Sequence, residues 1–157
     1  MKNVILTLAT TALVSTAAIA DDSKKFDGFF TGVETGYVFS GSSDVFIYGG
    51  NIGYRNQSET DIVFGVEGTF SGTDVNGIDF LASTTLTIGQ AFGSKKNQLF
   101  YLGAGYALTK TDFGYNGAFK SDLGYEYALD NGFSIRLKAT TYEFDEFQTT
   151  AGFAYRF

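Results

Sequence analysis

The side chains that could carry chemistry in this sequence are acids, bases and hydroxyls, because its 157 residues include neither His nor Cys. The commonest general base and metal ligand is therefore missing, and no disulfide or thiolate metal site can form. Asp74, Asn76 and Asp79 are spaced faintly like a calcium loop, but the bidentate Glu is absent, so an Asn-Gly turn is the better interpretation. No Ser-x-x-Lys pattern lies near the end of a predicted strand. We therefore expect no enzyme activity, no bound metal and no cofactor.

The elements that must position the remaining charges follow a period of two residues. Apolar residues alternate with glycines and polar residues over stretches of about 10 residues, and clusters of Gly, Asn, Asp and Ser separate the stretches. Asp130-Asn131-Gly132 is the clearest hairpin turn among these clusters. We predict one domain, residues 28–157. The alternation predicts eight strands, over residues 29–39, 46–55, 64–70, 78–88, 100–109, 119–129, 133–140 and 147–157.

The face that points inward decides between two classes of barrel, because soluble barrels bury their apolar face whereas outer-membrane barrels expose it. The polar face here carries glycines and charges of both signs, and the apolar face has aromatics near the strand ends, as at two membrane interfaces. A secreted ligand carrier of lipocalin type is less favoured for these reasons. We predict an all-β, eight-stranded antiparallel up-and-down transmembrane β-barrel. The predicted aromatic girdle comprises Phe29, Phe39, Phe46, Tyr54, Phe70, Phe80, Phe100, Phe119, Tyr127, Phe133, Phe147 and Tyr155.

The interior of such a barrel has room only for its own side chains. A buried charge without a partner costs several kcal/mol or more, so we predict that Arg136 and Lys138 bridge acids from several strands and close the interior. "Gly-Val-Glu" occurs twice, which places Glu34 and Glu67 at the same depth of two strands. Four acids and three bases share this depth, so we expect one carboxyl to be protonated or to contact trapped water. The predicted charge network comprises Glu34, Glu67, Lys120, Asp122, Glu126, Arg136 and Lys138.

Residues 1–20 have the pattern of a secretory signal peptide. Lys2 precedes a short apolar stretch, and Ala18-Ile19-Ala20 forms an A-x-A cleavage site before Asp21. A membrane anchor is less favoured, because the stretch contains several Thr and is short for a span of about 20 apolar residues. We expect cleavage after Ala20, export through the inner membrane and a short periplasmic lead over residues 21–27.

The last strand ends in the pattern Thr-x-Gly-x-x-Tyr-x-Phe, formed by Thr150, Gly152, Tyr155 and Phe157. With the signal peptide and the eight alternating stretches, this ending resembles the small outer-membrane β-barrel family of OmpA/OmpX type, over the whole mature chain. The resemblance implies that these four residues form an assembly signal, which the barrel-assembly machinery of a Gram-negative cell reads. It is specific for architecture and implies no particular activity.

The composition also limits the partners of the protein. A formal net charge of −6 without a basic run argues against nucleic-acid binding. We expect a monomer in contact with outer-membrane lipid and lipopolysaccharide, with both termini in the periplasm. Short outer loops weaken an adhesin or receptor role, and the longest connection, Gln90 to Gln98, is expected on the periplasmic side. The expected function is a structural or surface-interaction role. A narrow passive pore and a soluble periplasmic carrier are the alternatives.

Overall fold

The eight predicted strands are all present, and most of them extend beyond the alternating residues. The computed structural model describes residues 24–40, 43–74, 77–112 and 114–157, so the predicted signal peptide and residues 21–23 lie outside the described residues. No helix formed by the described residues is long and apolar enough to cross a membrane. The strands are β1 (Gly28–Ser40), β2 (Ser43–Gln57), β3 (Ile62–Thr73), β4 (Ile78–Phe92), β5 (Gln98–Thr111), β6 (Gly114–Ala128), β7 (Phe133–Tyr142) and β8 (Glu146–Arg156).

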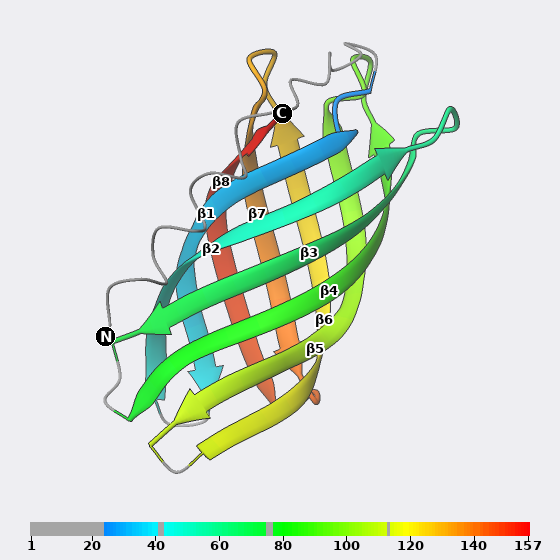
Figure 1. Cartoon of the computed structure of the whole chain (residues 1–157). Coiled ribbons are helices and arrows are strands. Elements are labelled where there is room, and N and C mark those ends of the chain that lie inside the picture. The colour runs from blue at the N-terminus through cyan, green and yellow to red at the C-terminus, as the bar shows by residue number, and fades with distance from the viewer. Residues whose placement is uncertain (1–23, 41–42, 75–76, 113) are drawn as a thin grey trace, which may run out of the picture.

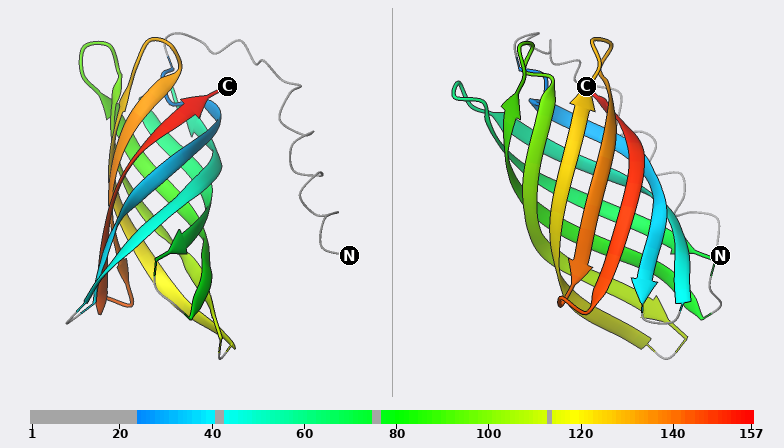
Figure 2. Two further views of the ribbon diagram at one scale, coloured as in Figure 1. Left: turned by 90° about the vertical axis from the view of Figure 1, so that its left-hand side faces the viewer. Right: turned by 180° about the vertical axis from the view of Figure 1, so that it is seen from behind.

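Each strand pairs antiparallel with the next, and β1 pairs with β8 to close a barrel (Figure 1). The closing register runs from Phe30 opposite Arg156 to Phe39 opposite Phe147. Both views in Figure 2 show strands that are strongly tilted, as closure of an eight-stranded sheet requires. We call the end that holds residues 24–27 and the C-terminus the terminal end, and the opposite end the distal end.

Gly152 lies at the seam between β1 and β8, where the two backbones approach closely. A Cβ atom at this position would collide with the carbonyl oxygen of Val33 and the Cα atom of Glu34. Only glycine fits such a site without displacing a strand. The glycine of the predicted assembly signal is therefore also a packing requirement of barrel closure.

The connections between strands are short at both ends of the barrel. The distal connections have two to four residues, and those at the terminal end have four or five. The predicted bounds of the longest connection, Gln90 to Gln98, were wrong, because Gln90 pairs with Phe100 and Phe92 pairs with Gln98. Only residues 93–97 form the turn. The alternation did not reveal the end of β4, because Gln90 is a polar residue on the outward face.

The outer surface of the barrel is apolar and aromatic. Exposed large apolar side chains occur on all eight strands, which is the reverse of a soluble carrier barrel. Phe46 and Phe80 are half-buried rather than exposed, because their rings pack 5.5 Å from Tyr37 and 5.2 Å from Phe70. The other predicted girdle residues are exposed, toward the terminal end for Phe29, Tyr54, Phe100, Tyr127, Phe133 and Tyr155, and toward the distal end for Phe39, Phe70, Phe119 and Phe147.

Candidate functional site: the ion-pair network inside the barrel

Arg136 on β7 connects acids from two other strands at mid-depth of the barrel. Its Nη2 lies 2.5 Å from Oε2 of Glu67 on β3, and its Nε lies 3.1 Å from Oε2 of Glu126 on β6. Arg136 is only 4% exposed, and its Nη2 also donates a hydrogen bond to the Tyr101 hydroxyl at 3.0 Å. One guanidinium therefore bridges two buried carboxylates.

Lys138, two residues further along β7, extends the network to β1. Its Nζ donates to both carboxylate oxygens of Glu34, at 3.0 and 2.9 Å, and to Oε1 of Glu67 at 3.3 Å. Asn51 adds a hydrogen bond from its Nδ2 to Glu34 at 3.3 Å. The two Glu residues of the repeated "Gly-Val-Glu" thus share one ammonium group, as expected for residues at a common depth.

Arg55 on β2 belongs to the network but was missing from the predicted set. Its Nη1 lies 2.7 Å from Oε2 of Glu126, whose other oxygen accepts a hydrogen bond from the Ser134 hydroxyl at 2.6 Å. With Arg55 included, four acids face four bases at this depth. The reason for expecting a protonated carboxyl therefore disappears, since it depended on an excess of acids. The charged groups at this depth are Glu34, Glu67, Asp122, Glu126, Arg55, Lys120, Arg136 and Lys138.

Lys120 and Asp122 form a separate pair on β6 rather than joining the larger network. Lys120 Nζ lies 3.2 Å from Asp122 Oδ2 and donates to the Ser83 hydroxyl at 3.2 Å. The Thr140 hydroxyl donates to the other carboxylate oxygen of Asp122 at 2.6 Å. Five of the seven predicted residues are therefore linked through Arg136 and Lys138, and the other two pair with each other.

Two aromatic rings complete the environment of the guanidinium groups. Arg55 lies 4.5 Å from the Phe30 ring centre and 5.3 Å from that of Tyr101, and Arg136 lies against the same rings at 5.3 and 6.0 Å. Arg55 Nη2 and Arg136 Nη1 have no hydrogen-bond partner among the described residues, and the ring faces supply a cation–π contact to these groups. Gly124 makes room for the Tyr101 ring, since a Cβ atom there would overlap it.

The terminal end of the barrel is covered by the residues that precede β1. Phe26 is 3% exposed and packs with Leu99 and Tyr101 in an apolar cluster beneath the ion pairs. Its backbone N–H donates to Oε1 of Gln57 at 3.0 Å, and Arg156 donates from Nη1 to the Lys24 carbonyl at 2.5 Å. Phe26 has no periodic partner in the sequence, so the alternation gave no signal for it.

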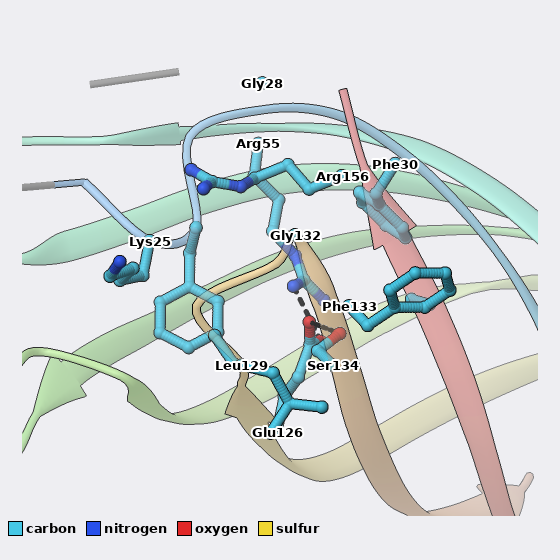
Figure 3. A pocket seen from close by; sticks show the side chains of 13 residues that line it. Lys25, Gly28, Phe30, Arg55, Glu126, Leu129, Gly132, Phe133, Ser134 and Arg156 are labelled. Carbon is cyan, nitrogen blue, oxygen red and sulfur yellow. Dashed lines mark hydrogen bonds and ion pairs between the residues drawn. The ribbon is translucent and has the colours of Figure 1, made fainter. Parts of the chain in front are cut away.

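Figure 3 shows the space that remains beside this cover, with Arg55, Glu126 and Ser134 joined by hydrogen bonds on its inner side. The cavity has a volume of about 10 Å³, which is close to the minimum for a single water molecule. No group of three or more acids in the described part of the chain is arranged to hold a metal ion. The acids and bases of this ion-pair network therefore neutralise one another.

The four residues of the predicted assembly signal lie on and just beyond β8. Thr150 faces the interior and Gly152 lies at the seam, whereas Tyr155 faces outward and packs with tilted rings against Phe133, with 4.9 Å between the ring centres. Phe157 packs edge-on against Tyr155 at 5.2 Å, and its N–H donates to the Phe29 carbonyl at 2.9 Å. The last residue is therefore fixed to the first strand.

A closed antiparallel barrel with an apolar exterior and paired charges inside defines a transmembrane β-barrel. No protein-family model matches this sequence, and no curated protein sequence matches it. Among solved structures, it is similar to a de novo designed transmembrane β-barrel, with a TM-score of 0.57 and 12% identity over 82% of this chain and 94% of the design.

Two natural barrels are similar to the same degree. Neisserial surface protein A matches with a TM-score of 0.55 and 16% identity, over 83% of this chain and 98% of its own. The N-terminal β-barrel domain of Pseudomonas aeruginosa OprF matches with a TM-score of 0.51 and 18% identity, over 82% of this chain and 97% of its own. The chain therefore has the fold of the small eight-stranded outer-membrane barrels.

Proposed function

We propose that this protein is an integral outer-membrane β-barrel, not an enzyme, whose interior is closed by its own side chains. Its role is structural or surface interaction rather than transport. The fold similarity to small outer-membrane barrels supports the location, and so does the signal-peptide pattern of residues 1–20. With eight strands both termini lie on one side, which we assign to the periplasm, and the distal end faces the outside.

The observation that carries this proposal is the continuous obstruction of the interior. Phe26 and its apolar cluster cover the terminal end, and the ion pairs of Arg55, Arg136 and Lys138 cross the barrel directly beyond them. Moving an ion through this region would require breaking buried pairs, each of which costs about 3–5 kcal/mol to disrupt. This obstructed interior favours a structural role of the barrel over a role as a pore.

Planar-bilayer recording of the refolded protein tests the closed interior. The wild-type protein should give no stable single-channel steps, whereas the variant F26A/R136A should give frequent conducting events. The control F29A removes an outward ring, 56% exposed, from the same end and should remain silent. Stable steps from the wild-type protein would refute the closed interior and establish the pore.

Fractionation tests the location separately. The protein should sediment with outer membranes, should require detergent for extraction and should change gel mobility on boiling, as folded membrane barrels do. Release by osmotic shock without detergent would contradict the membrane assignment. The partners that follow from the proposal are outer-membrane lipid, lipopolysaccharide and, during biogenesis, the barrel-assembly machinery. We expect a monomer.

A further inference from the structure

Beyond the ion-pair network, toward the distal end, the walls of the barrel carry apolar side chains among uncharged polar ones such as Thr73, Thr109 and Asn116. Val38, Val45, Ile47 and Leu81 lie here on β1, β2 and β4, and Ala107 continues the same wall on β5. Outer-membrane barrels ordinarily have a polar interior, since water fills what side chains leave free. The apolar side chains at this end therefore offer a contact surface for a ligand that is itself partly apolar.

These walls enclose a cavity of about 500 Å³, which we call the distal cavity. Its volume lies within the range of about 300–1,000 Å³ that small-molecule sites occupy. Among the described residues of the connections at this end, Glu143 and Asp145 line the cavity. The distal cavity differs in volume from the terminal end, where Phe26 and its neighbours leave only about 10 Å³.

The open side of the distal cavity is acidic. Glu143, Asp145 and Glu146 contribute to its lining, and no Lys or Arg is among the described residues that line it. Deeper in the cavity, the Tyr142 hydroxyl donates a hydrogen bond to Gln148 at 2.7 Å and so presents an already satisfied polar pair. An anionic ligand would be repelled at the entrance, whereas a cationic ligand would be attracted by the carboxylates.

We propose that the distal cavity binds a small amphiphilic cation. The apolar body of the ligand lies against Val38, Ile47 and Leu81, and its ammonium or guanidinium group lies beside Glu143 and Asp145. Burial of the apolar body supplies most of the affinity, at roughly 25 cal/mol per Å² of apolar surface removed from water. The carboxylates select a cationic ligand over an anionic one. The proposal depends on the barrel fold and not on the side of the membrane that the distal end faces.

The test uses the full mature chain in zwitterionic phosphatidylcholine nanodiscs and three probes of equal chain length: octyltrimethylammonium, octyl glucoside and octyl sulfate. Methyl NMR shifts of Val45, Ile47 and Leu81 report binding in the cavity, and empty nanodiscs give the background partitioning. Octyltrimethylammonium should bind saturably and about tenfold more tightly than octyl sulfate, the ratio expected when exposed carboxylates contribute up to about 1 kcal/mol each.

Matched variants separate the charge from the cavity. E143Q/D145N should lose about tenfold in affinity for the ammonium probe and keep its affinity for the glucoside, because only the carboxylates change. D44N removes an exposed distal acid outside the cavity lining and should bind like the wild type.

The variant A118F should fill the cavity and abolish binding of all three probes, whereas S121F adds the same ring to the outward face of β6 and should not. A heat-dependent mobility shift equal to that of the wild type shows that each variant is folded, so a lost signal reports the cavity alone. Equal binding of ammonium and sulfate, or unchanged binding in folded A118F, would overturn the proposal.

Discussion

Replacing Arg136 with Ala should destabilise the barrel by about 3–5 kcal/mol, the usual cost of removing one partner from a buried ion pair. The two acids that it contacts are affected differently. Glu126 keeps Arg55 at 2.7 Å and Ser134 at 2.6 Å, whereas Glu67 keeps only Lys138 at the longer distance of 3.3 Å. Most of the lost free energy of unfolding should therefore arise at Glu67, which remains buried with only one of its two cationic partners.

The second change that tests this reasoning is E67Q in the R136A background. If an uncompensated Glu67 carboxylate causes the loss, removing its charge should recover part of the stability, with a coupling of about 0.5–3 kcal/mol between the two positions. In the wild-type background E67Q should instead destabilise, since Arg136 and Lys138 then lose an acid. The sign of the effect of E67Q thus depends on whether Arg136 is present.

Urea unfolding of the protein in lipid vesicles, followed by far-ultraviolet circular dichroism, measures both effects. With a slope of about 2 kcal/mol per M, the R136A midpoint should lie about 2 M below that of the wild type. K96A removes a partly exposed partner of Asp61 at the terminal end and should lower the midpoint by no more than about 0.5 M, because an exposed pair contributes at most about 1 kcal/mol. An unchanged midpoint for R136A, or an E67Q effect of the same sign in both backgrounds, would show that the pairing does not stabilise the barrel.

Four further outcomes follow from the structure. Gly152→Ala should lower the folded fraction on boiled and unboiled gels, because its Cβ would collide with β1, and normal folding would contradict the seam geometry. Phe26→Ala should lower the free energy of unfolding by about 3–5 kcal/mol, measured by urea titration. Deleting Phe157 should impair assembly in cells while refolding in detergent continues, and normal insertion in cells would refute the signal. The hydrogen bond from Lys96 holds the pKa of Asp61 below its ordinary value, so this pair stabilises the fold at neutral pH and ceases to do so as acid protonates Asp61; carboxyl NMR should show its pKa rising in Lys96→Met.

The strands could be predicted from the sequence because the membrane imposes the alternation directly. Most outward positions are apolar whatever their neighbours are, so residues such as Val33, Val66 and Leu86 identify their strands without any knowledge of pairing. The rule weakens near the interfaces, where outward polar residues are tolerated. That is why the end of β4 at Gln90 was interpreted as part of a loop.

The contacts inside the barrel depend on a geometry that the alternation does not contain. Arg55 and Glu126 are 71 residues apart on strands that are not neighbours in the sheet, so no pairing rule brings them together. Their meeting depends on the tilt and stagger of all eight strands. Phe26 precedes the first strand and has no periodicity, and the distal cavity depends on how side chains of β1, β2, β4, β5 and β6 are spaced across the barrel.

The seam between β1 and β8 has a consequence for the order of folding events. Until β8 is made, β1 has an unpaired edge of backbone N–H and C=O groups, which neither lipid nor a shorter chain can satisfy. The Glu34 carboxylate likewise has no ion pair with Lys138 until that residue, 104 positions later in the chain, is in place. Loop closure over so many residues is slow, and a truncated chain has no partially closed state of low energy. Insertion is therefore expected to be nearly all-or-none, committed only when the last strand arrives.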